Sequence, residues 1–383
     1  AFSIFVQPLQ DEFGWSRTQI NVSLSFAALG SLASPFWGKI IDQYGSKYVM
    51  VFCLCVSGLS YITRPLIDEL WHFYAMSALQ FVGLAGTAQL PAGKLIGTWF
   101  QKARGRVMGL TMMGNNFGGL IVPIIVGVTI SFYSWEFAYI VLGATTIGVA
   151  FISIITIKDI PDKTTPVTIS GTSGVNEQYT YGGLSIREAL TRKSFYMITG
   201  AIICGTFTYG TVLPQVFVHL TNEGASFSTA AQALSALAIF GMAGKLTFGY
   251  LAERITARYS LILCLAGQSM FLLLMLWSSN NLVLWTSVPM FGLCMGAFGA
   301  LMSLIVQEGF GIKHFGSVMG LILLTSVVPF SIGPIIAGMS FDHTSHYHSA
   351  FISVTAMFLL AIVLLIQAGA PEFRVEPGAE FVD

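Results

Sequence analysis

The stretch that decides the fold is Gly105–Gly127, which reads GRVMGLTMMGNNFGGLIVPIIVG. A shift of 211 residues, from 105 to 316, places it on Gly316–Gly338, which reads GSVMGLILLTSVVPFSIGPIIAG, and 10 of the 23 paired positions are identical. Without any gap, the same shift places Asp42 on Glu253. A single offset that holds over two separate regions indicates an internal repeat. The sequence therefore predicts two consecutive halves that share one fold.

The composition indicates the environment of these halves. Of the 383 residues, 54% are apolar and only 9% are charged, whereas soluble domains carry about 25% charged residues. Such a chain cannot cover a water-facing surface, which excludes a soluble globular enzyme. The formal net charge is zero, so the chain has no general attraction to nucleic acid. We therefore predict an all-α polytopic membrane protein embedded in a lipid bilayer.

The apolar segments predict the number of membrane spans. A helix needs about 20 mostly apolar residues to cross a bilayer. Residues 1–9 are too short, and we expect them to be the outer half of a truncated first helix. The complete spans are predicted at residues 19–38, 48–66, 71–99, 107–130, 137–157, 195–220, 228–250, 259–278, 283–311, 316–340 and 349–369. Eleven complete spans and one half predict a twelve-helix fold with six helices in each half.

Polar segments and basic residues predict the domain boundaries and the orientation. The boundaries are 1–157 for the first half, 158–194 for a polar linker, 195–369 for the second half and 370–383 for a polar tail. Of the 18 lysines and arginines, 14 fall in loops on one side and only Arg17 and Arg64 fall on the other. Because cytoplasmic loops are enriched in basic residues, the linker and the tail are predicted to be cytoplasmic. Lys94 and Lys245 remain inside spans.

The sequence contains little that supports catalysis or cofactor binding. Its five cysteines are odd in number and show no metal-ligand spacing, so we expect neither a disulfide framework nor a metal site. His343, His346 and His348 lie beside Asp342 in the last outer loop. Their spacing would suit a metal, but a solvated loop is the preferred interpretation. Without a Walker loop, a dinucleotide fingerprint or a catalytic triad order, we expect no cofactor and no enzyme activity.

A glycine–acid motif occurs at the end of the second span of each half. Residues 38–47 read GKIIDQYGSK, and residues 249–253 of the copy read GYLAE. The glycine allows close helix approach, and the acid can accept charge-assisted hydrogen bonds from a neighbouring cation. The motif resembles the G-x-x-x-D-x-x-G-x-[RK] signature of the major facilitator superfamily and implies a cytoplasmic gate; the alternative is a solvated turn that only sets the topology. The expected gate residues are Gly38, Asp42, Gly45, Lys47, Arg104, Arg106, Gly249, Glu253 and Arg258.

Three further stretches narrow the resemblance. Residues 7–17, QPLQDEFGWSR, resemble the P-L-x-x-E-F-G-W-S-R segment of the monocarboxylate transporter-like branch, which includes relatives of the oxalate/formate antiporter. Residues 91–114 and 207–214 resemble its fourth-to-fifth-span stretch and its seventh span. The resemblance implies a secondary transporter, and we expect it to be a monomer in the cell inner (plasma) membrane. It would move a small organic anion, such as lactate, pyruvate, formate or oxalate, by alternating access coupled to protons or to exchange.

The lysines inside the spans are the candidate substrate-binding residues. A lysine at this depth costs roughly 2.5–3.5 kcal/mol on insertion scales, and an aqueous cavity or a bound anion would reduce that cost. The resemblance implies that Lys245 occupies the position of an arginine that binds the substrate carboxylate. Lys94 is a second candidate, and together the two charges would suit a dicarboxylate, or a monocarboxylate plus a nearby acid. For both lysines the alternative is snorkelling of the ammonium group to the cytoplasmic interface.

Three other residues complete the predicted site. Glu308, inside the tenth span, could carry a coupled proton or neutralise a lysine, and the alternative is a solvated cap at the helix end. Tyr209 lies in the stretch that resembles a cavity-lining seventh span, and Asn115 lies in the repeated stretch of the fifth span, so both are expected to orient the substrate. As an alternative, single polar residues in membrane helices bridge neighbouring helices. Two other functions stay open, namely efflux of a neutral or amphiphilic compound and a non-transporting membrane sensor.

Overall fold

The computed structural model describes residues 2–100, 103–159 and 182–369, and these are almost entirely helical. The tail and most of the linker lie outside the described residues. The helices of the first half are α1 (Phe2–Phe13), α2 (Arg17–Ser25), α3 (Ala27–Tyr44), α4 (Ser46–Ile62), α5 (Leu70–Leu84), α6 (Gln89–Trp99), α7 (Arg104–Phe132) and α8 (Trp135–Thr156), with a 3₁₀ turn at Arg64–Leu66.

The second half repeats this pattern of long helices. Its elements are α9 (Ile186–Thr191), α10 (Lys193–Phe207), a π-helical turn (Thr208–Val212), a 3₁₀ turn (Leu213–Gln215), α11 (Val216–Asn222), α12 (Phe227–Ile255), α13 (Ala257–Met275), α14 (Asn281–Phe310), α15 (Phe315–Leu324), α16 (Val327–Thr344) and α17 (His348–Gln367). The π-helical turn joins α10 to α11, which together make up the predicted seventh span.

Nine helical stretches among the described residues are long and apolar enough to cross a membrane. Three of these stretches each comprise two helices that follow one another in the sequence: α2 and α3, α10 and α11, and α15 and α16. The helix α4 is shorter but also apolar. The span predicted at 71–99 is divided into α5 and α6 by a turn at residues 85–88. With α1, this order follows the predicted series of spans and confirms the all-α membrane fold.

Local sequence explains where several of these helices begin. Ser16 accepts a hydrogen bond from the backbone N–H of Gln19, and the Gln19 side chain accepts one from Ser16 N–H, which forms a capping box at α2. Ser134 and Ser226 cap α8 and α12 with their side-chain oxygens. Between α3 and α4 the chain turns at Gly45, whose φ of +90° is readily adopted only by glycine.

The two halves meet through glycines on four helices. Helix α3 packs against α15, and α7 packs against α12. A Cβ added at Gly38 would lie 2.0 Å from the carbonyl oxygen of Gly316, and one added at Gly105 would lie 2.0 Å from that of Gly249. The repeat relates these two crossings, because it pairs Gly38 with Gly249 and Gly105 with Gly316. A larger residue would force the backbones apart, so these glycines fix where the halves touch.

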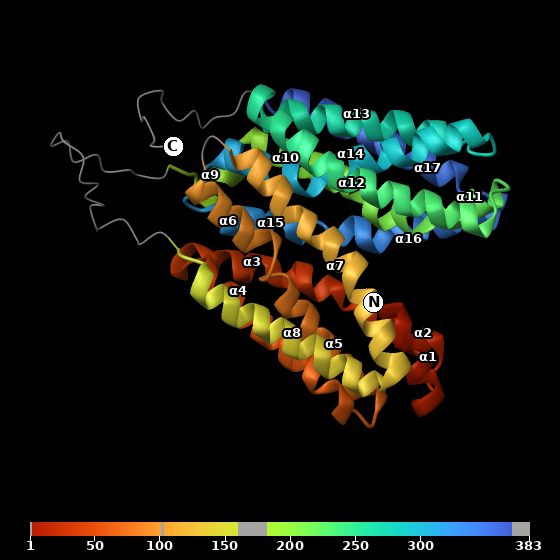
Figure 1. Ribbon diagram of the computed structural model, residues 1–383. Coiled ribbons are helices and arrows are strands. Elements are labelled where there is room, and N and C mark those ends of the chain that lie inside the picture. Colours follow the sequence, from red (N-terminus) through yellow and green to blue (C-terminus); the bar gives the residue numbers. More distant parts are fainter. Residues whose placement is uncertain (1, 101–102, 160–181, 370–383) are drawn as a thin grey trace.

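The halves separate toward the opposite end. At four glycines further along α7, an added Cβ would meet open space, with no atom of another described element within 4 Å. They are Gly114, Gly118, Gly119 and Gly127. Figure 1 shows the two groups of helices together where α3, α6 and α15 meet, and diverging away from that point. We call the end with residues 38–47, 94–100, 103–106, 249–258 and 307–317 the closed end, and the other the open end. Several of the basic residues that predict the cytoplasmic side lie in these described ranges, namely Lys39, Lys47, Arg104, Arg106, Arg254, Arg258 and Lys313.

Replacing Gly105 with alanine is expected to destabilise the protein, because the new methyl group would collide with the Gly249 carbonyl. Overpacking of this kind costs about 1–3 kcal/mol. Thermal unfolding of the purified protein in detergent should show a lower melting temperature for Gly105→Ala than for the parent. Gly114→Ala is the matched control on the same helix, since it has open space around it. Parent-like melting of both variants would contradict the close contact.

Candidate functional site

Asp42, at the end of α3, joins the two halves at the closed end. Its side chain is only 6% exposed, and its Oδ1 accepts a hydrogen bond from Lys94 Nζ at 2.8 Å. The carboxylate also accepts from the backbone N–H groups of Gly316 at 3.0 Å and Ser317 at 2.7 Å, in the first turn of α15. The N-terminus of a helix carries partial positive charge, which stabilises an anion there. Asp42 therefore caps a helix of the other half.

Lys94 completes this contact from α6. Its ammonium group also donates to the carbonyl oxygens of Ile312 and Lys313, each at 2.7 Å. With Asp42, these acceptors use the three N–H bonds of the group. The structure places Lys94 beside the predicted gate residue Asp42, and its expected role in substrate binding stays a prediction. The ion pair ties α6 to α3, and the two hydrogen bonds to carbonyl oxygens tie α6 to the loop before α15.

Glu253, at the end of α12, makes the corresponding contact on the other side of the repeat. Its Oε1 accepts from the backbone N–H of Arg106 at 2.7 Å, and its Oε2 accepts from Arg106 Nε at 2.8 Å. Arg106 lies in the first turn of α7, so Glu253 caps α7 as Asp42 caps α15. The shift that pairs Asp42 with Glu253 also pairs Arg106 with Ser317. The structure thus brings Glu253 and Arg106 together across the halves.

The remaining predicted gate residues surround these two contacts. The Nε of Arg104 donates a hydrogen bond to the carbonyl oxygen of Phe100 at 3.1 Å. The guanidinium carbon of Arg258 lies 5.0 Å from the centre of the Tyr259 ring. The backbone N–H of Lys47, beside the turn at Gly45, donates to Asp159 at 2.9 Å. Asp159 was not singled out from the sequence, because only the fold brings the residues after α8 to the start of α4.

Lys245 lies in α12 at the contact with α7, and it is 9% exposed. Its ammonium group donates to the backbone carbonyl of Met112 at 2.7 Å and to the side-chain oxygen of Asn116. Among the described residues, no carboxylate forms an ion pair with it. A buried charge with only neutral partners is costly. The contact between the halves therefore holds a positive charge that an anion could neutralise.

Asn116, and not the expected Asn115, is the asparagine that contacts Lys245. It also donates from Nδ2 to the carbonyl oxygen of Ala238 in α12 at 3.3 Å, whereas Asn115 is exposed. The helical period of α7 could have distinguished Asn116 from Asn115 in the sequence. Asn116 follows Gly109 by seven residues and shares its face of α7, and consecutive residues are rotated by about 100°. The face that packs against α12 therefore includes Asn116 and turns Asn115 away.

Tyr209 and Glu308 make contacts inside the second half. The hydroxyl of Tyr209 donates to the carbonyl oxygen of Met295 in α14 at 3.2 Å. Both oxygens of Glu308 accept from the backbone N–H of Ala257, at 2.9 and 3.0 Å, where α13 begins. Glu308 thus caps the start of α13, and its expected role as a proton carrier stays a prediction. Neither residue contacts Lys245 or Lys94, so the structure does not gather the five predicted site residues at one point.

Arg64 is a buried cation that the sequence placed in an outer loop of the first half. It is 3% exposed and donates to the Tyr139 hydroxyl at 2.9 Å, to Ser77 Oγ at 3.2 Å and to Gln80 Oε1 at 2.7 Å. Three aromatic rings lie 4.8–5.5 Å from its guanidinium carbon. It lines a cavity of about 100 Å³ among the helices of the first half. The residues of this cavity differ from those around Lys245.

The sequence of the chain matches the family model described as the Major Facilitator Superfamily over residues 1–327 and 195–381. Human monocarboxylate transporter 12 is 26% identical over 368 residues, which cover 87% of this chain and 69% of the relative. A probable sulfoacetate transporter of Cupriavidus necator is 24% identical over 397 residues, covering 97% of this chain and 91% of the relative. These relatives are transporters, which agrees with the expectation that the chain is not an enzyme.

Solved structures of the same superfamily share the fold. The transporter FucP in its outward conformation matches with a TM-score of 0.74 at 14% identity, over 96% of this chain and 94% of that chain. The human organic anion transporter MFSD10 matches with a TM-score of 0.71 at 14% identity, over 95% of this chain and 89% of that chain. The expected superfamily and its fold are thereby confirmed, and the chain belongs to the Major Facilitator Superfamily.

Proposed function

We propose that this chain is a secondary transporter that moves a small organic anion by alternating access between its two halves. The observation that carries the proposal is Lys245, a buried ammonium group at the contact of α7 with α12 whose acceptors are neutral. A carboxylate entering from the open end would take the place of Asn116 as an acceptor. The resulting charge-assisted hydrogen bond is roughly twice as strong as one between neutral groups.

The relatives support an anionic substrate. Monocarboxylate transporters are by their name carriers of singly charged carboxylates, and the relative from Cupriavidus necator is named for sulfoacetate. At 22–27% identity these names support the class of solute for this chain and leave the individual compound to experiment. The movement would be driven by a proton gradient or by exchange for a second anion.

The placement of Lys94 favours a monocarboxylate over oxalate. Two cations at one site would suit a dicarboxylate, but the ammonium group of Lys94 is paired with Asp42 and two carbonyl oxygens at the closed end. This leaves Lys245 as the cation available to a solute at the contact of α7 with α12. A single ammonium group matches a single carboxylate, so lactate, pyruvate or formate suits the site better than oxalate.

We also propose that the closed end is a cytoplasmic gate that opens during each cycle. Asp42 and Glu253 hold it by capping α15 and α7, each across the boundary between the halves. A carboxylate at a helix N-terminus contributes about 0.3–1 kcal/mol, and up to about 2 kcal/mol when partly buried. Contacts of this size can hold one state and still be broken, which suits an element that must exchange between two arrangements.

Replacing Lys245 with glutamine is expected to reduce uptake of lactate or pyruvate into proteoliposomes by about tenfold or more, because losing one partner of a buried charge pair costs roughly 2–5 kcal/mol. Lys245→Arg keeps the charge and should retain more activity than Lys245→Gln. Lys39→Gln, which removes an exposed lysine at the closed end, is the matched control. Parent-like uptake by a correctly folded Lys245→Gln protein would remove Lys245 from the site.

Acetate and acetamide provide a second test, because they are similar in size and differ in charge. Acetate should compete with uptake of labelled lactate, whereas acetamide should have no effect at the same concentration. Oxalate should inhibit less than acetate, since the site offers one ammonium group. Equal inhibition by acetate and acetamide would instead support the alternative function, transport of a neutral or amphiphilic compound.

Replacing Asp42 with asparagine is expected to open the closed end more often, because the neutral amide interacts weakly with the α15 N-terminus and with Lys94. A cysteine introduced at Ser317, which is 7% exposed, should then react about fivefold faster with a water-soluble maleimide, the equivalent of about 1 kcal/mol. The parent without Ser317→Cys gives the background from the native cysteines. Asp68→Asn, which changes an exposed acid at the open end, should leave the rate unchanged.

A further inference from the structure

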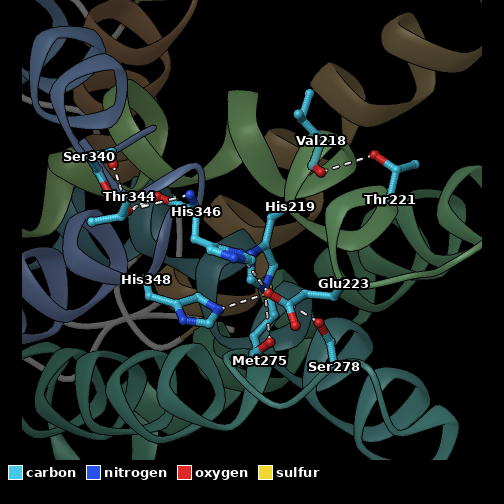
Figure 2. A network of polar contacts seen from close by, with 10 residues as sticks. All are labelled: Val218, His219, Thr221, Glu223, Met275, Ser278, Ser340, Thr344, His346 and His348. Atoms are coloured by element: carbon cyan, nitrogen blue, oxygen red, sulfur yellow. Dashed lines mark hydrogen bonds and ion pairs between the residues drawn. The ribbon is translucent and has the colours of Figure 1, made fainter. Parts of the chain in front are cut away.

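Three histidines and a glutamate gather at the open end of the second half, as Figure 2 shows. His219 lies in α11, and Glu223 follows that helix at its C-cap position. His346 lies in the loop after α16, and His348 begins α17. Packing brings together residues more than 120 positions apart in the sequence, and the cluster joins the seventh span to the last helix.

Glu223 is the centre of this cluster. Its Oε1 lies 2.8 Å from His348 Nε2 and 3.5 Å from His346 Nδ1, and its side chain is 12% exposed. Among the described residues, the ion-pair partners of Glu223 are histidines, with no lysine or arginine. Neutral imidazoles leave its negative charge uncompensated. The cluster therefore lacks a positive charge at a pH where the histidines are deprotonated.

The spacing of the ligand atoms suits one metal ion. One such atom from each of His219, Glu223 and His348 lies within 4.8 Å of the others. A tetrahedral zinc ion holds ligands at about 2.0–2.2 Å, which places the ligand atoms about 3.3–3.6 Å apart. The side chains of His346 and His348 are 48% and 40% exposed, so they have room to rotate toward an ion.

His219 makes a hydrogen bond of the kind that metal-ligating histidines make with their second ring nitrogen. It is 1% exposed, and its Nε2 lies 3.0 Å from the carbonyl oxygen of Met275. A carbonyl oxygen can only accept, so Nε2 carries the proton and Nδ1 keeps its lone pair. Metal-ligating histidines donate their second ring N–H to such a carbonyl or carboxylate, which fixes the tautomer. In the sequence His219 is separated from the other histidines, which is why spacing alone did not indicate this cluster.

We propose that His219, Glu223 and His348, with His346 as the fourth ligand, bind a divalent transition-metal cation of the zinc type. Imidazole and carboxylate donors in a three-nitrogen, one-oxygen set suit Zn²⁺ and disfavour Mg²⁺, which prefers oxygen ligands in octahedral geometry. The ion supplies the positive charge that Glu223 lacks. It links α11 to the start of α17 and so holds the open end of the second half together.

Zinc binding to the full-length, untagged protein in detergent, treated with EDTA and dialysed, tests this site. Calorimetry at pH 7.5 should show one Zn²⁺ per chain, and zinc should raise the melting temperature because it binds the folded state. Mg²⁺ should do neither. His348→Ala and Glu223→Gln should each weaken zinc binding by about tenfold or more, since even outer partners of metal ligands contribute 10–100-fold. These two positions are preferred to the buried His219, where a substitution could impair folding.

His343→Ala is the matched control, because His343 lies in the same region, is exposed and is outside the cluster. It should bind zinc like the parent. At pH 5.5, below the ordinary histidine pKa of about 6.5, protons should compete and zinc binding should weaken. The proposal is overturned if zinc neither binds nor stabilises the parent, or if the His348→Ala and Glu223→Gln proteins bind it like the parent. Equal losses in His343→Ala and His348→Ala, or an affinity unchanged at pH 5.5, would overturn it as well.

Discussion

Close approach of the backbones at two glycine pairs, one between α3 and α15 and one between α7 and α12, is the constraint on which the rest depends. It brings the end of one helix beside the first turn of a helix in the other half. The free N–H groups of that turn need acceptors, and Asp42 and Glu253 supply them. The closed end is thus held by carboxylates that act on helix N-termini, with Lys94 and Arg106 as their cationic partners.

The same principle operates within each half at this end. Asp159 accepts from the first N–H groups of α4, and Glu308 accepts from the first of α13. The repeat relates the two capped positions, Ser46 and Ala257, because they are 211 residues apart, but the two acids come from different parts of the sequence. Four acids therefore cap four helix starts at the closed end. In the proposed transport cycle, the caps within a half would persist, whereas the caps between halves would break when the closed end opens.

Lys94 and Lys245, the two lysines inside predicted spans, have different surroundings in this fold. Both ammonium groups lie inside apolar segments, where a charge is costly, and they differ in their neighbours. Lys94 has a carboxylate at 2.8 Å, so its charge is compensated. Both partners of this ion pair also form hydrogen bonds with residues 312–317 of the other half. Lys245 has a carbonyl and an amide oxygen, so its charge remains available to an anionic solute. The presence or absence of one acid thus separates a residue that stabilises a conformation from one that is proposed to bind substrate.

The sequence by itself determined the class of protein, the order of the spans and the pairing of two acids, Asp42 and Glu253, by the internal repeat. Apolar length, helical period and the repeat are local properties, readable along one chain, and Asp42 and Glu253 follow from the repeat. Which side chains meet was decided by tertiary structure alone. Lys94 pairs with Asp42, Lys245 with Asn116, and His348 with Glu223 because helix rotation and crossing bring distant residues together. Composition and spacing do not specify those crossings, since they arise from backbone approach between helices far apart in the chain.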